Sequence, residues 1–202
     1  MDFGLTDKVA MVAASSKGIG LACAQALARE GCRVSICARH EDVLEQAAES
    51  IEGECFTYVV DVCDADDLNW WVEQTRQDAG RIDILVTNTG GPPAGALDTM
   101  TDEQWQLGFD ATLMNVVRLV RMVAPEMAER GWGRIVHLSS LVAKDPNMML
   151  PISSTLRAGL QSLTRLQASQ YAASGVTVNA VLPGHTMTDR QLHLAELRAQ
   201  RE

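Results

Sequence analysis

The chain has 202 residues, a length that suits one domain with a sizeable buried core. Hydrophobic residues make up 47% and charged residues 21%, which is typical of a globular protein and not of a disordered chain. The net charge of −9 argues against a nucleic-acid partner, although local groups can still hold an anionic cofactor. No run of about 18 apolar residues and no signal peptide occurs, so we expect a cytoplasmic protein without a membrane segment.

All five cysteines fall in the first third of the chain. Their number is odd, and no cysteine or histidine spacing suits zinc. We interpret them as reduced core residues and predict no metal site.

The first motif is the stretch 12–20, Val-Ala-Ala-Ser-Ser-Lys-Gly-Ile-Gly, between a strand predicted at 8–13 and a helix predicted at 19–30. A strand that turns through such residues into a helix presents free N–H groups and the positive end of the helix dipole to a phosphate. The next strand, predicted at 33–37, completes a βαβ unit. The predicted phosphate-binding residues are Ser15, Ser16, Lys17, Gly18, Ile19 and Gly20.

This loop departs from the usual dinucleotide fingerprint, which has three glycines. Ala14 stands at the first glycine position. Taken alone, the loop is therefore also compatible with a Gly/Ser turn in an ordinary α/β protein.

A cation follows the second strand. In a doubly wound sheet this strand end lies over the ribose of a bound dinucleotide, where an acid would favour NAD. Arg39 is there instead, and Lys17 adds a second cation on the same side. Each could be a solvated surface charge, but together they suit a 2′-phosphate and favour NADP(H) over NAD(H).

The rest of the chain alternates helices and strands without an internal repeat or a linker. Further helices are predicted at 42–51, 65–78, 101–130, 153–173 and 191–202, and further strands at 55–60, 82–87, 134–138 and 176–182. We therefore predict one α/β domain over residues 1–202. It has a Rossmann-type doubly wound parallel sheet of order 3-2-1-4-5-6 between two helix layers, a three-layer αβα arrangement.

Asp61 and Val62 follow the third strand. A carboxylate at this strand end could accept a hydrogen bond from an adenine amino group. Its alternative role is to cap the next helix, although Asp64 or Asp66 fits that role better.

Turns also follow the fourth and sixth strands, at 88–91 and 183–186. Sheets of this kind bind ligands at the carboxyl ends of their strands. The residues predicted to contact the cofactor there are Asn88, Gly90, Pro183 and Gly184.

Together these motifs resemble the short-chain dehydrogenase/reductase family, with a pattern nearest to the 3-oxoacyl-(acyl-carrier-protein) reductases. The resemblance covers nearly the whole chain and rests on the segments 15–20, 61–62, 83–90, 133–140 and 178–184. It implies an oxidoreductase that transfers hydride from a nicotinamide cofactor to a small carbonyl compound or a 3-oxoacyl thioester.

The resemblance also implies four catalytic positions: an Asn, a Ser, a Tyr and a Lys. In the family the Tyr protonates the carbonyl, the Lys holds the nicotinamide ribose and lowers the pKa of the Tyr, the Ser orients the carbonyl, and the Asn holds a relay water. Counted along the motifs, these positions fall on Thr112, Ser140, Ser153 and Arg157. Only the serine is kept, and Arg157 takes over the expected contact with the cofactor ribose.

These changes leave two hypotheses open. A serine hydroxyl is a far weaker acid than a phenol of pKa about 10, and Arg157 keeps the charge but releases no proton at neutral pH. His185 is an alternative acid, although a surface histidine is its more ordinary interpretation. The protein is either an NADP-dependent carbonyl reductase with altered proton delivery or an inactive nucleotide-binding or scaffold protein of the same fold.

The family usually continues for some tens of residues, through a substrate-covering helical segment and a seventh strand. We expect the sequence to lack both, so either the chain is genuinely short or a tail is missing from it; without that tail the sixth strand would lie at a sheet edge. Surplus apolar residues on the helices at 101–130 and 153–173, such as Leu119, Leu160 and Leu166, predict a helix-to-helix contact in a homodimer or homotetramer.

Overall fold

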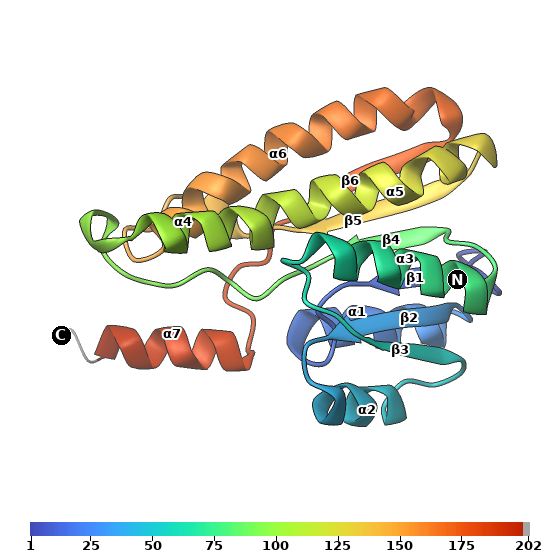
Figure 1. Cartoon of the computed structure of the whole chain (residues 1–202), viewed down its shortest axis with the longest axis horizontal. Helices are drawn as coiled ribbons and strands as arrows, with labels where there is room; N and C mark the ends of the chain where they lie inside the picture. Colours follow the sequence, from blue (N-terminus) through green and yellow to red (C-terminus); the bar gives the residue numbers. More distant parts are fainter. Residues whose placement is uncertain (200–202) are drawn as a thin grey trace.

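The computed structural model describes residues 1–199, apart from the side chains at 197 and 198. Within these residues six parallel strands form one sheet of order β3-β2-β1-β4-β5-β6, which confirms the predicted topology (Figure 1). The strands are β1 (Val9–Val12), β2 (Arg33–Ala38), β3 (Cys55–Val59), β4 (Ile84–Thr87), β5 (Gly133–Leu138) and β6 (Val176–Val181). The strand order reverses between β1 and β4, so ligands are expected at the carboxyl ends of these strands.

Helices cover both faces of the sheet. They are α1 (Gly18–Arg29), α2 (Glu41–Glu49), α3 (Ala65–Ala79), α4 (Asp102–Phe109), α5 (Asn115–Glu129), α6 (Pro151–Tyr171) and α7 (Asp189–Ala199). Side chains of α1 and α2 pack with one face of the sheet, and side chains of α3, α5 and α6 pack with the other. Helices α4 and α7 extend beyond the carboxyl ends of the strands (Figure 1).

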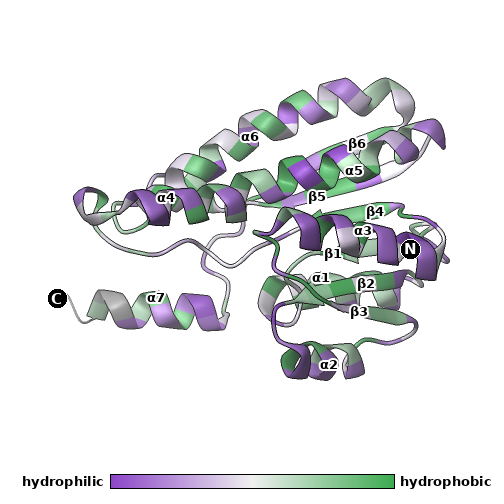
Figure 2. Ribbon diagram, viewed as in Figure 1, coloured by the Kyte–Doolittle hydropathy of each residue, from purple (hydrophilic) through white to green (hydrophobic). Residues whose placement is uncertain are grey.

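The central strands β1 and β4 are largely apolar because every one of their residues is buried, as expected where helices cover both faces of a parallel sheet. Figure 2 shows them as largely hydrophobic, whereas the helices mix hydrophobic and hydrophilic residues. The pair Trp70 and Trp71 on α3 shows this division within one helix. Trp71 is fully buried and Trp70 is 47% exposed, because adjacent helical residues face different sides.

The long helix predicted at 101–130 is interrupted. Thr101 and Gln104 form the predicted capping box at its start. A π-helical turn, η2 (Asp110–Met114), then separates α4 from α5. Within the described residues, the buried oxygens Thr112 Oγ1 and Asn115 Oδ1, at and just after this turn, have no hydrogen-bond partner. Such turns are frequent at functional sites.

Helix α6 begins at Pro151, two residues before the predicted start. Proline suits the first helical position because its missing N–H would have no partner there. Ser153 and Arg157 therefore lie in the first two turns of α6.

Strand β6 pairs with β5 alone among the described strands, and its residues Thr177, Asn179 and Val181 are exposed. Leu119 and Leu160, predicted to belong to a surplus apolar face, are instead buried in the core. Their burial leaves Leu166, which is 69% exposed, to support the predicted assembly.

The described residues contain no helix that is both long and apolar enough to cross a membrane. No group of three or more candidate metal ligands occurs among them either. The five cysteines are free, and burial raises the pKa of the Cys37 thiol to about 12.

A buried histidine connects β4, β5 and α6. His137 is fully buried, with Nδ1 2.8 Å from Thr87 Oγ1 and Nε2 2.9 Å from Gln167 Oε1. Because an amide oxygen only accepts, Nε2 carries the proton and Nδ1 accepts from the Thr87 hydroxyl. Burial lowers the pKa of His137 to about 4, and the bond to Gln167 opposes this shift only in part.

This shift predicts an acid-sensitive stability. Because the folded-state pKa lies below the unfolded value of about 6.5, the contribution is complete above that pH and is lost as the pH falls towards 4. We expect about 2 kcal/mol to be lost at pH 5, measured by urea unfolding at pH 7.5 and pH 5. The variant His137→Asn keeps every other titrating group, so an equal loss in both proteins would contradict the prediction.

Candidate active site

The loop after β1 opens a site for a phosphate. Helix α1 begins at Gly18 without a side-chain cap and without an acid in its first turn. The backbone of Lys17 is extended, and Gly18 has a φ of +59°, which favours glycine. The N–H groups of the first turn have no intrahelical partner and lie at the positive end of the helix dipole. This arrangement fits the phosphates of a dinucleotide cofactor.

Two close contacts hold this loop against β4. The side-chain amide of Asn88 donates to the carbonyl oxygen of Ala14 at 2.9 Å. A Cβ atom at Gly20 would lie 2.7 Å from the Ala14 oxygen and 2.7 Å from the Asn88 nitrogen. Only glycine fits position 20, and Asn88, predicted to contact the cofactor, positions the loop itself.

Two of the predicted loop serines differ in surroundings. The hydroxyl of Ser15 is fully buried and donates to the carbonyl oxygen of Val12 at 2.7 Å. Its backbone N–H donates to Cys37 across the sheet. Ser15 therefore shapes the loop through its side chain, whereas Ser16 is half-buried at the loop surface.

The two predicted phosphate cations also differ. Lys17 Nζ lies 3.1 Å from Asp189 Oδ2 in the first turn of α7, and both side chains are largely exposed. Arg39, exposed just after β2, has no ion pair within residues 1–199. Arg39 therefore keeps its charge for a ligand, while a phosphate at Lys17 competes with Asp189.

The acid after β3 does not cap α3. Asp64 takes that role and accepts from the N–H groups of Asp66 and Asp67. The Asp61 carboxylate accepts from the N–H of Cys63 at 2.9 Å, and its two oxygens offer further acceptor positions at the strand end. The neighbouring Val62 side chain is buried in the core, which leaves its backbone for any cofactor contact.

The predicted reacting groups lie after β5 and on α6. Ser140 is half-buried and accepts weakly from the N–H of Val142 at 3.4 Å. The Ser153 hydroxyl is buried and has no hydrogen-bond partner in the described part of the chain. By contrast, Ser154 Oγ accepts from the N–H of Asn147 at 3.1 Å. Ser153 is thus the serine of this pair that is free to hold a ligand.

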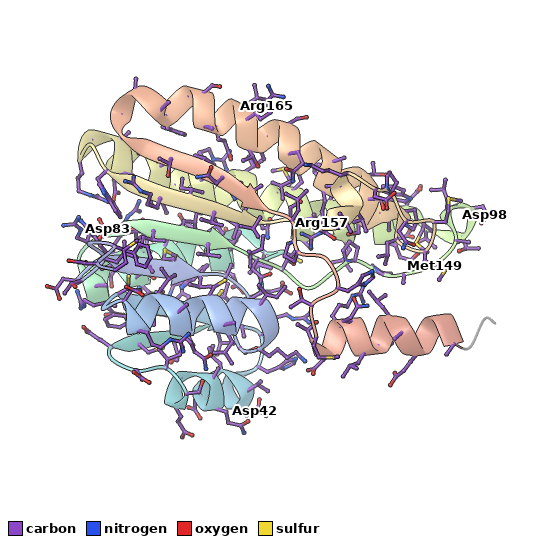
Figure 3. All side chains as sticks on the ribbon, turned by 180° about the vertical axis from the view of Figure 1, so that it is seen from behind. Asp42, Asp83, Asp98, Met149, Arg157 and Arg165 are labelled. Atoms are coloured by element: carbon purple, nitrogen blue, oxygen red, sulfur yellow. The ribbon has the colours of Figure 1, made fainter. Side chains whose placement is uncertain are left out.

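Arg157 lies one turn after Ser153, on the same side of the helix. Its side chain is only 7% exposed, and Nη1 donates to the carbonyl oxygen of Leu138 at 2.8 Å. Burial, and then the charge of Arg190, lower the pKa of Arg157 to about 10, so it stays a cation at neutral pH. Figure 3 shows it where the chain leaves β6 for α7.

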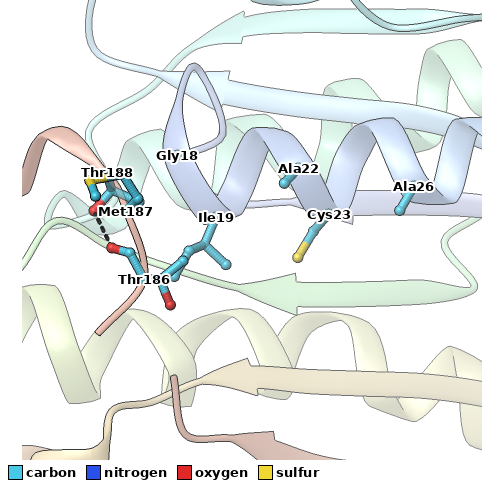
Figure 4. Close-up of a pocket in the computed structure, with 8 residues that line it drawn as sticks. All are labelled: Gly18, Ile19, Ala22, Cys23, Ala26, Thr186, Met187 and Thr188. Carbon is cyan, nitrogen blue, oxygen red and sulfur yellow. Dashed lines mark hydrogen bonds between the residues drawn. The ribbon is translucent and has the colours of Figure 1, made fainter. Parts of the chain in front are cut away.

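The segment after β6 closes one side of this region. The carbonyl oxygen of Pro183 accepts from the N–H of Leu141, and Gly184 is exposed. His185 is an exposed residue beside Gln191, in agreement with its more ordinary interpretation. An open pocket lies between α1 and this segment (Figure 4). Its lining residues are Gly18, Ile19, Ala22, Cys23, Ala26, Thr186, Met187 and Thr188.

Comparison with known proteins assigns the family. The sequence profile of the family described as short chain dehydrogenase matches residues 8–198. The chain belongs to this family. An acetoacetyl-CoA reductase from Cupriavidus necator is 32% identical over 92% of this chain and 77% of its own length. A 3-oxoacyl-[acyl-carrier-protein] reductase from Thermotoga maritima is 33% identical over 95% of this chain and 79% of its own length.

Solved structures agree with this assignment. The L-sorbose reductase of Gluconobacter frateurii, complexed with NADPH and L-sorbose, matches this chain with a TM-score of 0.92. The two are 32% identical, and the match covers 99% of this chain and 78% of that structure. The comparisons support a nicotinamide cofactor in general terms and leave the substrate open.

Sequence reasoning missed two residues near this site. Asp189 meets Lys17 across 172 positions of sequence. Arg190 Nη2 donates to the carbonyl oxygen of Pro92 at 2.6 Å, across 98 positions. Both lie in the first turn of α7, and no local motif marks them.

The strained backbone at Ala14 gives a test of the loop. Ala14 has a φ of +46°, a region that costs a residue with a Cβ atom about 1–2 kcal/mol. We expect Ala14→Gly to raise the free energy of unfolding by about 0.5–1 kcal/mol, because greater freedom of the unfolded chain offsets part of the gain.

Urea unfolding of Ala14→Gly measures this gain. The matched control is Ala158→Gly at an exposed helical position of α6, which should lose about 1 kcal/mol. If Ala14→Gly and Ala158→Gly both lower the free energy of unfolding, the Ala14 backbone is not strained.

Proposed function

We propose that this protein is an NADP-dependent oxidoreductase that reduces the carbonyl group of a small molecule, with a 3-oxoacyl thioester as one candidate. The observation that carries the proposal is that two groups of residues lie at the same end of the sheet, where the strands have their carboxyl ends. The first group is the uncapped start of α1 with the cations Lys17 and Arg39 beside it. The second group is Ser153 and Arg157, which lie on α6 at the same end of the sheet. Family membership supports the reaction class.

The residues present fit the cofactor. The N–H groups at Gly18–Gly20 would hold its pyrophosphate, Arg39 and Lys17 its 2′-phosphate, and Asp61 its adenine. The N–H groups of Arg157 that do not bond Leu138 would hold the nicotinamide ribose. When bound, the cofactor supplies the hydride.

Ser140 and Ser153 have the chemistry to hold a carbonyl oxygen. Each hydroxyl can donate one hydrogen bond, and the nearby positive charge of Arg157 stabilises negative charge that develops on that oxygen. A serine does not replace a phenol as general acid, so the proton comes from water held by these hydroxyls. Loss of a positioned acid costs about 10²–10⁴ in rate, and we therefore infer a slow reductase.

Cofactor choice can be measured by fluorescence titration with NADPH and NADH. We expect tighter binding of NADPH, and we expect Arg39→Ala to weaken it by about tenfold while NADH binding stays unchanged, because only NADPH carries the 2′-phosphate. The control Arg29→Ala removes another exposed arginine, at the far end of α1, and should change neither affinity.

Equal weakening of both cofactors in Arg39→Ala would contradict this role of Arg39. No binding of either cofactor to the parent protein would instead favour the scaffold hypothesis.

The reacting positions can be tested by restoring the family's residues. We expect the double change Ser153→Tyr and Arg157→Lys to raise the rate of NADPH-dependent ketone reduction by about 10²–10⁴, because a phenol next to an ammonium can donate the proton. The matched control, Ser162→Tyr with Arg165→Lys on the exposed side of α6, should leave the rate unchanged. If the double variant folds and binds NADPH but reduces the ketone no faster than the parent protein, positions 153 and 157 are not the reacting positions.

The predicted homodimer or homotetramer and the cytoplasmic location stay predictions. An exposed Leu166 on α6 supports a helix-to-helix contact, but the burial of Leu119 and Leu160 reduces the apolar surface available for it.

A further inference from the structure

Two arginines converge where the family has one lysine. Arg157 comes from α6, and Arg190 comes from the first turn of α7. Each donates to a backbone carbonyl at or beyond the carboxyl end of a strand: Arg157 to Leu138, the last residue of β5, and Arg190 to Pro92, in the loop after β4. Since β4 and β5 are neighbours in the sheet, both guanidinium groups lie at the end of the sheet where the strands have their carboxyl ends.

Neither arginine is neutralised. Among residues 1–199, no ion pair includes Arg157 or Arg190. The acid nearest in sequence, Asp189, pairs with Lys17 instead. Arg157 is 7% exposed, and Arg190 is half-buried.

This arrangement has an energetic cost. A buried charge is expensive without a partner of opposite sign, and two like charges add to that cost. Burial lowers the pKa of both arginines, and the charge of Arg190 adds to the effect at Arg157. An anion between the two groups would relieve both penalties.

Hydrogen-bond donors for an anion are present. A guanidinium has five N–H donors, and one on each arginine is used by the carbonyl contact already described. Gly91 lets the Arg190 guanidinium pack against the turn after β4, because a Cβ atom there would lie only 3.1 Å from Nε and 3.1 Å from Nη2. The planar fork of arginine suits the two oxygens of a carboxylate.

We propose that Arg157 and Arg190 form an anion site that binds the carboxylate of an oxo-acid substrate, whose carbonyl group is held by Ser140 and Ser153. The inference rests on the proposed function and narrows its substrate class. The phosphates of the cofactor already have a place at the start of α1. Arg157 has more N–H donors than its bonds to Leu138 and to the ribose use, so donors of both arginines remain for the substrate. A thioester carries no such charge beside its carbonyl.

Acetoacetate and ethyl acetoacetate give the test, because they share a ketone and only the first carries a carboxylate. Calorimetry measures the binding of each probe to the parent protein, alone and with saturating NADPH, and NADPH binding is measured in parallel. We expect acetoacetate to bind at least about tenfold more tightly than the ester in both states. Arg190→Met should abolish this preference and leave NADPH affinity unchanged.

The control Arg165→Met removes an exposed arginine on the outer side of α6 and should keep the preference for acetoacetate (Figure 3). Equal binding of the two probes, or displacement of acetoacetate by NADPH, would overturn the proposal. Failure of the proposed function has a separate signature, because NADPH then does not bind while acetoacetate binding is still measured directly. Melting temperatures confirm that Arg190→Met is folded.

Discussion

The site depends on one hydrogen bond, from the Asn88 amide to the Ala14 carbonyl oxygen, and on the absence of a side chain at Gly20 beside it. The bond joins the end of β4 to the turn that follows β1, two strands that meet where the sheet order reverses. It fixes the angle at which α1 leaves the sheet. A side chain at position 20 would push the helix away, and the first-turn N–H groups would then lose their common direction.

Several parts of this site work against stability. Ala14 adopts a left-handed backbone conformation, Arg157 is buried without an acid, and Thr112 Oγ1 is buried without a partner among the described residues. Each would be unfavourable in a region selected for packing alone. Ala14 follows β1, Arg157 contacts the end of β5, and Thr112 lies in η2, which contacts α6. Such costs are expected where a protein exchanges stability for ligand binding.

The fold was predictable because its signals are local. Apolar runs mark each strand, and the switch to a helical period marks each helix, so the sheet order followed from one βαβ unit and its handedness. The π-helical turn at 110–114 escaped prediction because one extra residue leaves the apolar pattern of the flanking helices nearly intact. Asp189 and Arg190 were missed because their partners lie far away in sequence and obey no spacing rule.

Asp189 and Arg190 are adjacent residues that contact two different loops. Asp189 contacts the loop after β1 through Lys17, and Arg190 contacts the turn after β4. A ligand that takes Lys17 from Asp189 removes one of the two anchors at the start of α7. An exposed ion pair of this kind contributes at most about 1 kcal/mol, so the other anchor is weakened only modestly. Because coupling between two binding events is reciprocal, an occupant of the arginine pair would change the affinity for a phosphate at Lys17 by the same factor.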